Sequence, residues 1–373
     1  MASVKRRDHA YPLAQSIPQS TLDHEAERLE RAKSLPVLRR IALYVGLGGP
    51  GFLGAALTLG AGTMTAAMIS GATWGYRTLW LSIVAIGSGV FMMAAMARFT
   101  CQGGFSLLQV QKKKHGTLLG TVLAALIGVV AVAIVFNFGQ YALATHLIES
   151  IADIAGVSFP AELNWPVFAT ITIWMTLSYG RGHRGTTLVE RFMKYSLAIM
   201  IVCFAASLAV VGIDWGAAIK GMFIPWLPGG IRGIDLFIAS SAAAIGVMDW
   251  IVFHYAGLTK GWGPRHEKLA RIDILMGFAL PFLIVNFLVV SVFAATLYGS
   301  GTVPQTAMEL AAALMPLLGE TLGKVVFLVG FLAIPITTTV GMGIACGIAT
   351  HEAFGWRPDA NSWRWRISVL LPQ

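Results

Sequence analysis

Two neighbouring residues of an apolar segment, Met248 and Asp249, bring a thioether and a carboxylate to membrane depth. They lie in SSAAAIGVMDW (240–250), where a run of small residues meets an acid. A second apolar run, GPGFLGAALTLGAGTMTAA (49–67), is weakened at its middle, around Gly60–Thr65. Backbone that leaves a helix at membrane depth must line a polar cavity or be buried in protein, and a thioether is a soft metal ligand. The two segments therefore predict a polar site between two broken helices.

Asp249 carries the charge of this predicted site. A carboxylate at the centre of a span costs about 2.5–3.5 kcal/mol on insertion scales and marks a functional site or a buried partner. Either Asp249 belongs to a cation site beside Met248, or it lies lower and pairs with a Lys or Arg of a cytoplasmic loop. His254, farther along the same segment, is either a proton carrier or a hydrogen-bonded group at the cytoplasmic shoulder of the helix.

The elements that must position these residues are membrane helices. The chain is 56% hydrophobic and 12% charged, whereas soluble domains are about 25% charged, so an aqueous globular fold is excluded. Runs of about 20 apolar residues span a bilayer. The sequence contains eight such runs, the fourth of them short: 41–72, 78–97, 117–145, 166–180, 195–213, 236–256, 274–298 and 325–350. We predict an all-α integral membrane protein.

The basic residues show how these helices are oriented. The net charge of +9 would suit nucleic acid, but Lys and Arg alternate between rich and poor connections along the chain. By the positive-inside bias, the N-terminus and every second loop are cytoplasmic. We predict a soluble cytoplasmic tail over residues 1–40, a transmembrane domain over 41–373, the lipid bilayer as partner and no nucleic acid.

Catalytic and redox motifs are missing from the sequence. It contains no nucleophile–base pair, HExxH, Walker loop or paired CxxC, so we predict neither an enzyme nor a bound cofactor. The cysteines Cys101, Cys203 and Cys346 lie apart in apolar context, as small packing residues do. Nothing in the sequence indicates an oligomeric state.

The order of the two broken segments is itself informative. Breaks in the first and sixth helices indicate an inverted-repeat secondary transporter with its solute at the midplane. The alternative is that the glycines only permit close helix packing. The final run SWRWRISVLLPQ starts like a ninth helix, so we expect the chain to be a fragment or a truncated form of a longer transporter.

The segments GPGFL (49–53) and SGATWGYRTLW (70–80) resemble the first helix of the Nramp family of divalent-metal transporters. Similar matches follow in order: GRGHRGTTLVERFMKY in the fifth helix, KGMFIPWLPG before the sixth, VMDW within it and LVGFLAIPITTTVGMGIACGIATHEAFGW in the eighth. The resemblance covers about residues 49–356. It implies the inverted-repeat fold of the leucine transporter, here with helices 1–8 and the start of helix 9.

The resemblance also assigns the predicted site. The family's DPGN metal motif falls on Gly60, Ala61, Gly62 and Thr63, so glycine stands where the family has its metal-binding aspartate. Met248 matches the methionine ligand and Ile245 the residue that binds through its carbonyl. Asp249 and Trp250 replace a proline and a histidine. The family's proton-route acids in helix 3 fall near Ala133 and Phe136, so proton coupling of the family's kind is not expected.

We therefore expect an Nramp-like transporter of a divalent metal of the Mn, Fe or Mg type, in which Asp249 replaces the lost aspartate. Trp250, His254 and Asn286 are expected to line or gate the pathway, Asn286 alternatively joining two helices by a hydrogen bond. The threonines 337–339 either repair a kink at Pro335 or line the pathway. The alternatives are a transporter of another small solute or ion, and a degenerate protein that transports nothing. The expected location is a bacterial inner membrane.

Overall fold

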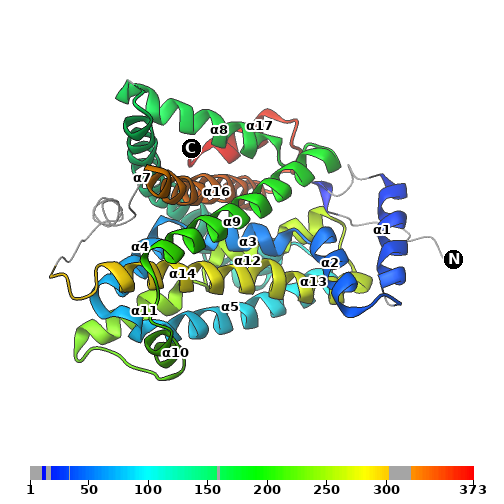
Figure 1. Cartoon of the computed structure of the whole chain (residues 1–373). Coiled ribbons are helices and arrows are strands. Elements are labelled where there is room, and N and C mark those ends of the chain that lie inside the picture. Colours follow the sequence, from blue (N-terminus) through cyan, green and yellow to red (C-terminus); the bar gives the residue numbers. More distant parts are fainter. Residues whose placement is uncertain (1–10, 14–17, 33, 158–159, 302–320) are drawn as a thin grey trace.

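The structure, a computed structural model, describes all residues except 1–10, 14–17, 33, 158–159 and 302–320. The described elements are helices packed side by side (Figure 1). The α-helices are α1 (Gln19–Ala32), α2 (Val37–Leu47), α3 (Pro50–Thr58), α4 (Ala61–Trp74), α5 (Trp80–Arg98), α6 (Leu107–Thr117), α7 (Val132–Ala155), α8 (Asn164–Ser178), α9 (Gly182–Val211), α10 (Trp215–Phe223), α11 (Ile231–Ala242), α12 (Val247–Thr259), α13 (Glu267–Asp273), α14 (Leu280–Thr296), α16 (Thr321–Phe354) and α17 (Trp363–Leu370). Tighter or wider helical turns extend some of them: η2 (Gly75–Thr78), η3 (Phe99–Gly103), η4 (Leu118–Ala131), η5 (Ala161–Leu163), η6 (Pro264–His266) and η7 (Ile274–Ala279).

The first predicted helix, 41–72, is three helices in the structure. The axis bends by 72° between α2 and α3, where Gly48 and Gly49 leave helical geometry and Pro50 begins the next helix. Proline suits a helix start because its missing N–H would have no intrahelical partner there. A second break separates α3 from α4 at Leu59 and Gly60. The prediction of one helix with a single break at its middle was therefore wrong, because the chain also bends at Gly48 and Gly49.

Within the described part, six helices are long and apolar enough to cross a membrane, or seven if α2 with α3 counts as one span. The remaining predicted span, 166–180, corresponds to α8, which has 15 residues. That length rises about 22 Å, less than the ~30 Å hydrocarbon core. The predicted spans near 195–213 and 325–350 are longer in the structure, as α9 and α16, because polar residues extend their ends.

The helix α16 lies at the centre of the bundle. Figure 1 shows it between α7 and α9, and it also packs against α3, α8 and α17. Its segment from Val340 to Ala349 is almost entirely buried. α16 continues through Pro335 without interruption. A helix so enclosed fixes the positions of the half-helices around it.

Described residues of the predicted N-terminal tail pack against the membrane helices. Tyr11 is buried with its ring 5.3 Å from that of Tyr255, and α1 buries Leu29 and Ala32. Burial raises the pKa of Glu25 on α1, although the charge of nearby Lys260 acts to lower it. Apolar side chains inside a charged sequence explain the docking.

We predict that close contact between α5 and the break in helix 6 depends on one glycine. A Cβ at Gly89 would lie 2.4 Å from the carbonyl oxygen of Ala244, whereas one at Gly87, on the same helix, would meet nothing within 4 Å. Gly89→Ala should destabilise the protein by about 1–3 kcal/mol because the backbone must move. Gly87→Ala should be neutral or stabilising by about 0.5–1 kcal/mol. Thermal unfolding in detergent would measure both, and equal effects would contradict the packing.

Candidate functional site

The break in helix 1 lies at two residues only. Leu59 has φ −79°, ψ 44° and Gly60 has φ −79°, ψ 176°, and helical geometry resumes at Ala61. The predicted break over 60–65 was therefore too long, since Gly62 and Thr63 are helical. The extended geometry of Gly60 is open to any residue; what glycine allows is the approach of α16, because a Cβ there would lie 3.0 Å from Thr338 Cγ2.

Side chains from other helices satisfy the interrupted backbone. The Ala61 amide donates to Gln140 Oε1 at 3.3 Å, and the Ala56 carbonyl accepts from the Thr337 and Thr338 hydroxyls, each at 3.3 Å. Buried backbone groups without such partners are costly in a membrane. The break is thus stabilised by the contacts of α3 with α16 and of α4 with α7.

The break in helix 6 separates α11 from α12 at residues 243–246. Asp249 N donates to Gly246 O at 3.1 Å, so the Ile245 carbonyl stays outside the helical hydrogen-bond ladder and is available as a ligand. Met248 is half-buried and packs partly against the core. The predicted break, 240–250, was again too long, because Met248 and Asp249 lie in the first turn of α12.

The side chain of Asp249 points toward α3. It is buried beside Gly246, where a Cβ would lie 2.6 Å from Asp249 Oδ2, and close to Thr58, whose hydroxyl donates to the Gly54 carbonyl at 2.8 Å. Among the described residues no Lys, Arg or His lies within 4 Å of it. The alternative of a salt bridge to a cytoplasmic loop therefore finds no partner in that part of the chain.

Of the five predicted site residues, Gly60, Thr63 and Asp249 lie in three different neighbourhoods. Asp249 lies against Thr58, and Gly60 lies against Thr338 and Gln140. Thr63 lines a separate cavity of about 20 Å³ with Ser240 and Asn286, room for about one water molecule. Sequence reasoning missed Thr58 and Gln140, although both are polar residues inside apolar helices, which is the signal that marks buried function.

The predicted pathway residues differ in their surroundings. Both ring nitrogens of His254 are engaged, Nδ1 with Thr100 Oγ1 at 2.8 Å and Nε2 with the Phe105 carbonyl at 3.0 Å. The structure therefore shows His254 as a hydrogen-bonded group. Trp250 is half-buried, and its indole N–H has no hydrogen-bond partner in the described chain. Asn286 is buried at the small cavity rather than joined by a described hydrogen bond.

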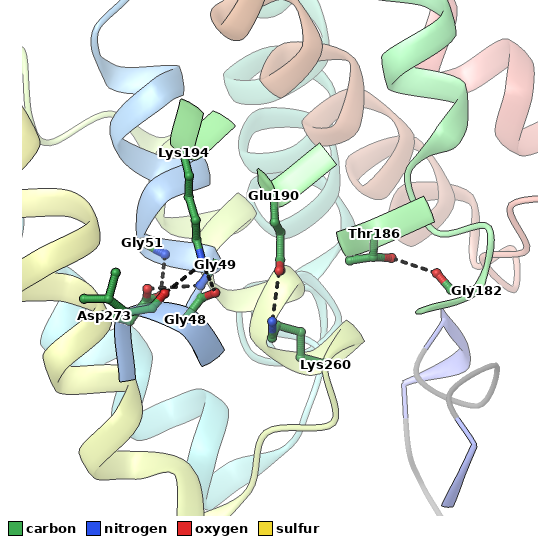
Figure 2. Close-up of polar contacts among 10 residues, drawn as sticks. Gly48, Gly49, Gly51, Gly182, Thr186, Glu190, Lys194, Lys260 and Asp273 are labelled. Carbon is green, nitrogen blue, oxygen red and sulfur yellow. Dashed lines mark hydrogen bonds and ion pairs between the residues drawn. The ribbon is translucent and has the colours of Figure 1, made fainter. Parts of the chain in front are cut away.

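A polar network holds the bend between α2 and α3 (Figure 2). Asp273 accepts hydrogen bonds from the Gly49 and Gly51 amides, at 3.0 and 2.6 Å, and so caps the start of α3. Lys194 Nζ donates to the carbonyls of Val45 and Gly48, at 2.9 and 2.7 Å, at the end of α2. An acid at a helix N-terminus and a base at a C-terminus both complement the helix dipoles.

Glu190 and Lys260 complete this network. Their ion pair is 2.9 Å long, with side chains 5% and 15% exposed, and it joins α9 to the end of α12. A Cβ at Gly49 would lie 2.3 Å from the Glu190 carboxyl carbon. Asp273 and Lys194 could not be recognised from the sequence as partners of these glycines, because their contacts join helices far apart in the chain.

Comparisons with known proteins agree with this architecture. The family profile described as "Natural resistance-associated macrophage protein-like", Nramp, matches residues 51–372. The chain is 26% identical over 318 residues to the divalent metal cation transporter MntH of Agrobacterium fabrum, covering 82% of this chain and 66% of that protein. It is 24% identical over 341 residues to MntH 1 of Pseudomonas aeruginosa, covering 88% and 73%.

Solved structures show the same fold. A crystal structure of the manganese transporter of Eremococcus coleocola aligns with a TM-score of 0.66 at 14% identity, covering 90% of this chain and 70% of that one. Mhp1, described as a nucleobase-cation-symport-1 family transporter, aligns with a TM-score of 0.53 at 16% identity, covering 87% and 70%. The fold is therefore the predicted inverted-repeat type. The chain spans 66% of the length of the Agrobacterium relative and 70% of the length of the Eremococcus transporter.

We predict that the Asp273 carboxylate is needed to hold α3. Hydrogen bonds to a charged acceptor contribute about 1.5–3 kcal/mol each, and an amide in Asp273→Asn can accept from only one of the two glycine N–H groups without turning its own N–H₂ toward the other. The control is Glu267→Gln on the same helix, whose ion pair with Arg271 is exposed, so that its loss should destabilise the protein far less. Thermal unfolding, with hydrogen exchange at Gly49 and Gly51, would test this; equal losses would refute it.

Proposed function

This chain belongs to the Nramp family, and we propose that it moves a divalent metal cation across the membrane through a site between the breaks in helices 1 and 6. The observation that carries the proposal is the Asp249 carboxylate. It is buried close to the end of α3, next to the break at Leu59 and Gly60, and has no cationic partner in the described chain. A buried carboxylate needs a compensating positive charge or a proton. A transported cation supplies that charge.

The groups around Asp249 suit a borderline metal. The end of α3 offers carbonyl oxygens, the Thr58 hydroxyl lies against the carboxylate, and the Ile245 carbonyl is outside the helical ladder. Met248 precedes Asp249 and brings a soft thioether. Mixed oxygen and sulfur ligands favour a metal of the Mn or Fe type over Mg, which prefers oxygen and its own water.

The proposed site differs from the one expected from the sequence. No group of three His, Cys, Asp or Glu that could hold a metal occurs among the described residues, so one carboxylate and neutral donors must suffice. Thr58 replaces Thr63 as the hydroxyl nearest Asp249, because Thr63 faces the small cavity. Gly60 contributes the backbone break rather than a ligand side chain.

The contacts of α3 also suggest how the site opens. The half-helix is held at its start by Asp273 and at its end by the threonines of α16. Release of the Asp273, Lys194 and Glu190–Lys260 contacts in Figure 2 would free α2 and α3 together. The alternation of basic loops supports a cytoplasmic N-terminus and puts this network on the same side, and the bacterial relatives support a location in the plasma membrane.

The other candidate functions have less support. A small organic solute would need more room than the cavity of about 20 Å³ between the outer halves of helices 1 and 6. A protein that transports nothing would have no reason to keep an unpaired buried carboxylate, which costs stability.

We predict that Asp249→Asn lowers divalent-metal affinity by about 100-fold or more, because loss of groups that only support a metal ligand already costs about 10–100-fold. The full-length protein in proteoliposomes would be assayed for uptake and binding of Mn, Fe, Mg and a panel of small organic solutes. The control is Asp235→Asn, an exposed acid on α11 of the same broken helix, which should leave uptake unchanged.

Unchanged metal affinity in Asp249→Asn would overturn the proposed site. Uptake of an organic solute without metal uptake would instead support the alternative cargo.

A further inference from the structure

A cavity of about 580 Å³ lies at the end of the bundle that the alternation of basic loops assigns to the cytoplasm. Its walls are the start of α9, the connection from α16 to α17, and Pro12 and Leu13 of the N-terminal segment. No residue of this lining belongs to the breaks in helices 1 and 6. The volume falls within the range of about 300–1,000 Å³ that is usual for small-molecule sites, so the cavity has room for a ligand of its own.

The cavity lies at the depth where membrane helices reach the lipid headgroups. The spanning helix α16 ends at Phe354, the spanning helix α9 begins at Gly182, and α17 begins at Trp363. Phe354 and Trp363 are 57% and 66% exposed, and the ring of Phe354 stacks on that of Trp356 with centroids 4.8 Å apart. Tryptophan concentrates where hydrocarbon meets water. The cavity is therefore next to aromatic side chains that are open to lipid.

Arg364 lines the cavity and rests against two indole rings. Its guanidinium carbon lies 5.0 Å from the ring centroid of Trp356 and 5.8 Å from that of Trp363. Contacts of this kind hold a guanidinium in place without using its five N–H donors. Arg364 makes no hydrogen bond or ion pair with the described residues. A positioned arginine with donors to spare suits the paired oxygens of a phosphate.

The two connections that wall the cavity have an excess of positive charge. The stretches 179–185 and 355–366 contain one acid, Asp359, and these arginines: Arg181, Arg184, Arg357, Arg364 and Arg366. Asp359 also lines the cavity, but its carboxylate accepts the Asn361 amide at 2.9 Å in the turn before α17. Basic pockets between membrane helices on the cytoplasmic side suit anionic lipid headgroups.

The start of α9 adds to this preference for an anion. This helix begins at Gly182 on the cavity wall, and no side chain caps its first turn. The positive end of the helix dipole favours a negative group there. A zwitterionic headgroup would bring a second cation among the arginines, whereas a phosphoglycerol headgroup brings a phosphate and hydroxyl groups.

We propose that this cavity binds the headgroup of an anionic phospholipid, with its phosphate on Arg364 and its acyl chains along the exposed faces of Phe354 and Trp363. The bound lipid ties the start of α9 to the connection between α16 and α17, so it stabilises the folded protein. This site is independent of the proposed metal transport.

The test uses the full-length protein in detergent with a chelator, so that its result does not depend on a metal. Thermal unfolding is measured at constant ionic strength during titration with phosphatidylglycerol, with phosphatidylcholine of the same acyl chains, or with glycerol 3-phosphate. A ligand that binds only the folded state raises the melting temperature. We expect saturable stabilisation by phosphatidylglycerol at a half-saturating concentration about tenfold or more below that of phosphatidylcholine.

Two outcomes of these titrations would overturn the proposal. Equal stabilisation by phosphatidylcholine would show that the headgroup charge is not recognised. Stabilisation by glycerol 3-phosphate at the same concentrations as the lipid would show a site for a soluble phosphate compound instead.

Variants locate the effect. Arg364→Gln should raise the half-saturating phosphatidylglycerol concentration by about tenfold or more, because hydrogen bonds from a charged donor are lost. Arg366→Gln is the matched control, since it removes the same charge from an exposed arginine of the same helix that does not line the cavity, and its lipid response should be unchanged. Arg364→Lys keeps the charge but not the planar fork, so an intermediate value is expected even if Arg364→Gln folds poorly.

Equal shifts in Arg364→Gln and Arg366→Gln would indicate general attraction to a basic surface and refute the site. The absence of a shift in both Arg364 variants would refute it as well.

Discussion

The rest of this structure depends on one constraint, which is that backbone groups at membrane depth need hydrogen-bond partners inside the protein. Helix 1 is interrupted twice, and each interruption has its own set of partners. Asp273 and Lys194 serve the bend at Gly48 and Gly49, while Gln140 and the α16 threonines serve the break at Gly60. The short helix α3 is therefore a separate rigid piece held at both ends.

Holding α3 in this way explains the burial of so many polar groups. Residues from α9, α13 and α16 meet this half-helix, although they come from distant parts of the sequence, and Gln140 of α7 meets the start of α4 just beyond it. The network at its start contains charges of both signs, so the charges compensate each other. The end of α3 is different, because carbonyls, hydroxyls and one carboxylate gather there without a described cation. This uncompensated negative charge, surrounded by oxygen ligands, is the physical basis for placing a divalent cation at the end of α3.

The space near Gly60 is occupied by Thr338 and Gln140, so this residue of the break has neutral polar neighbours. The negative charge at the breaks comes from helix 6 as Asp249, which lies close to the Thr58 side chain at the end of α3. Gly60 and Asp249 therefore have different polar neighbours.

Glycine has a packing role at several of these contacts. At Gly49, Gly60 and Gly89 the backbone geometry is not left-handed, and the reason for glycine is the nearness of a carboxyl group, a threonine or a carbonyl. The alternative considered from the sequence was that the glycines in the breaks of helices 1 and 6 only permit close packing. Close packing occurs at Gly60, whereas a Cβ at Gly62 would meet nothing within 4 Å. At Gly60 the close packing and the break in the helix occur together.

The sequence by itself determined the membrane class, the inverted-repeat fold, the family and the two broken helices, because apolar run length, charge alternation and short motifs are local properties of the chain. It also identified Asp249 as the charged residue of the breaks. Only the tertiary structure decided that Thr58 rather than Thr63 lies against Asp249, that Gln140 and Thr338 fill the space beside Gly60, and that Asp273 and Lys194 hold the bend. These pairings join residues as much as 282 positions apart, and which of many buried polar groups meet is set by how the helices pack, a property that no local pattern contains.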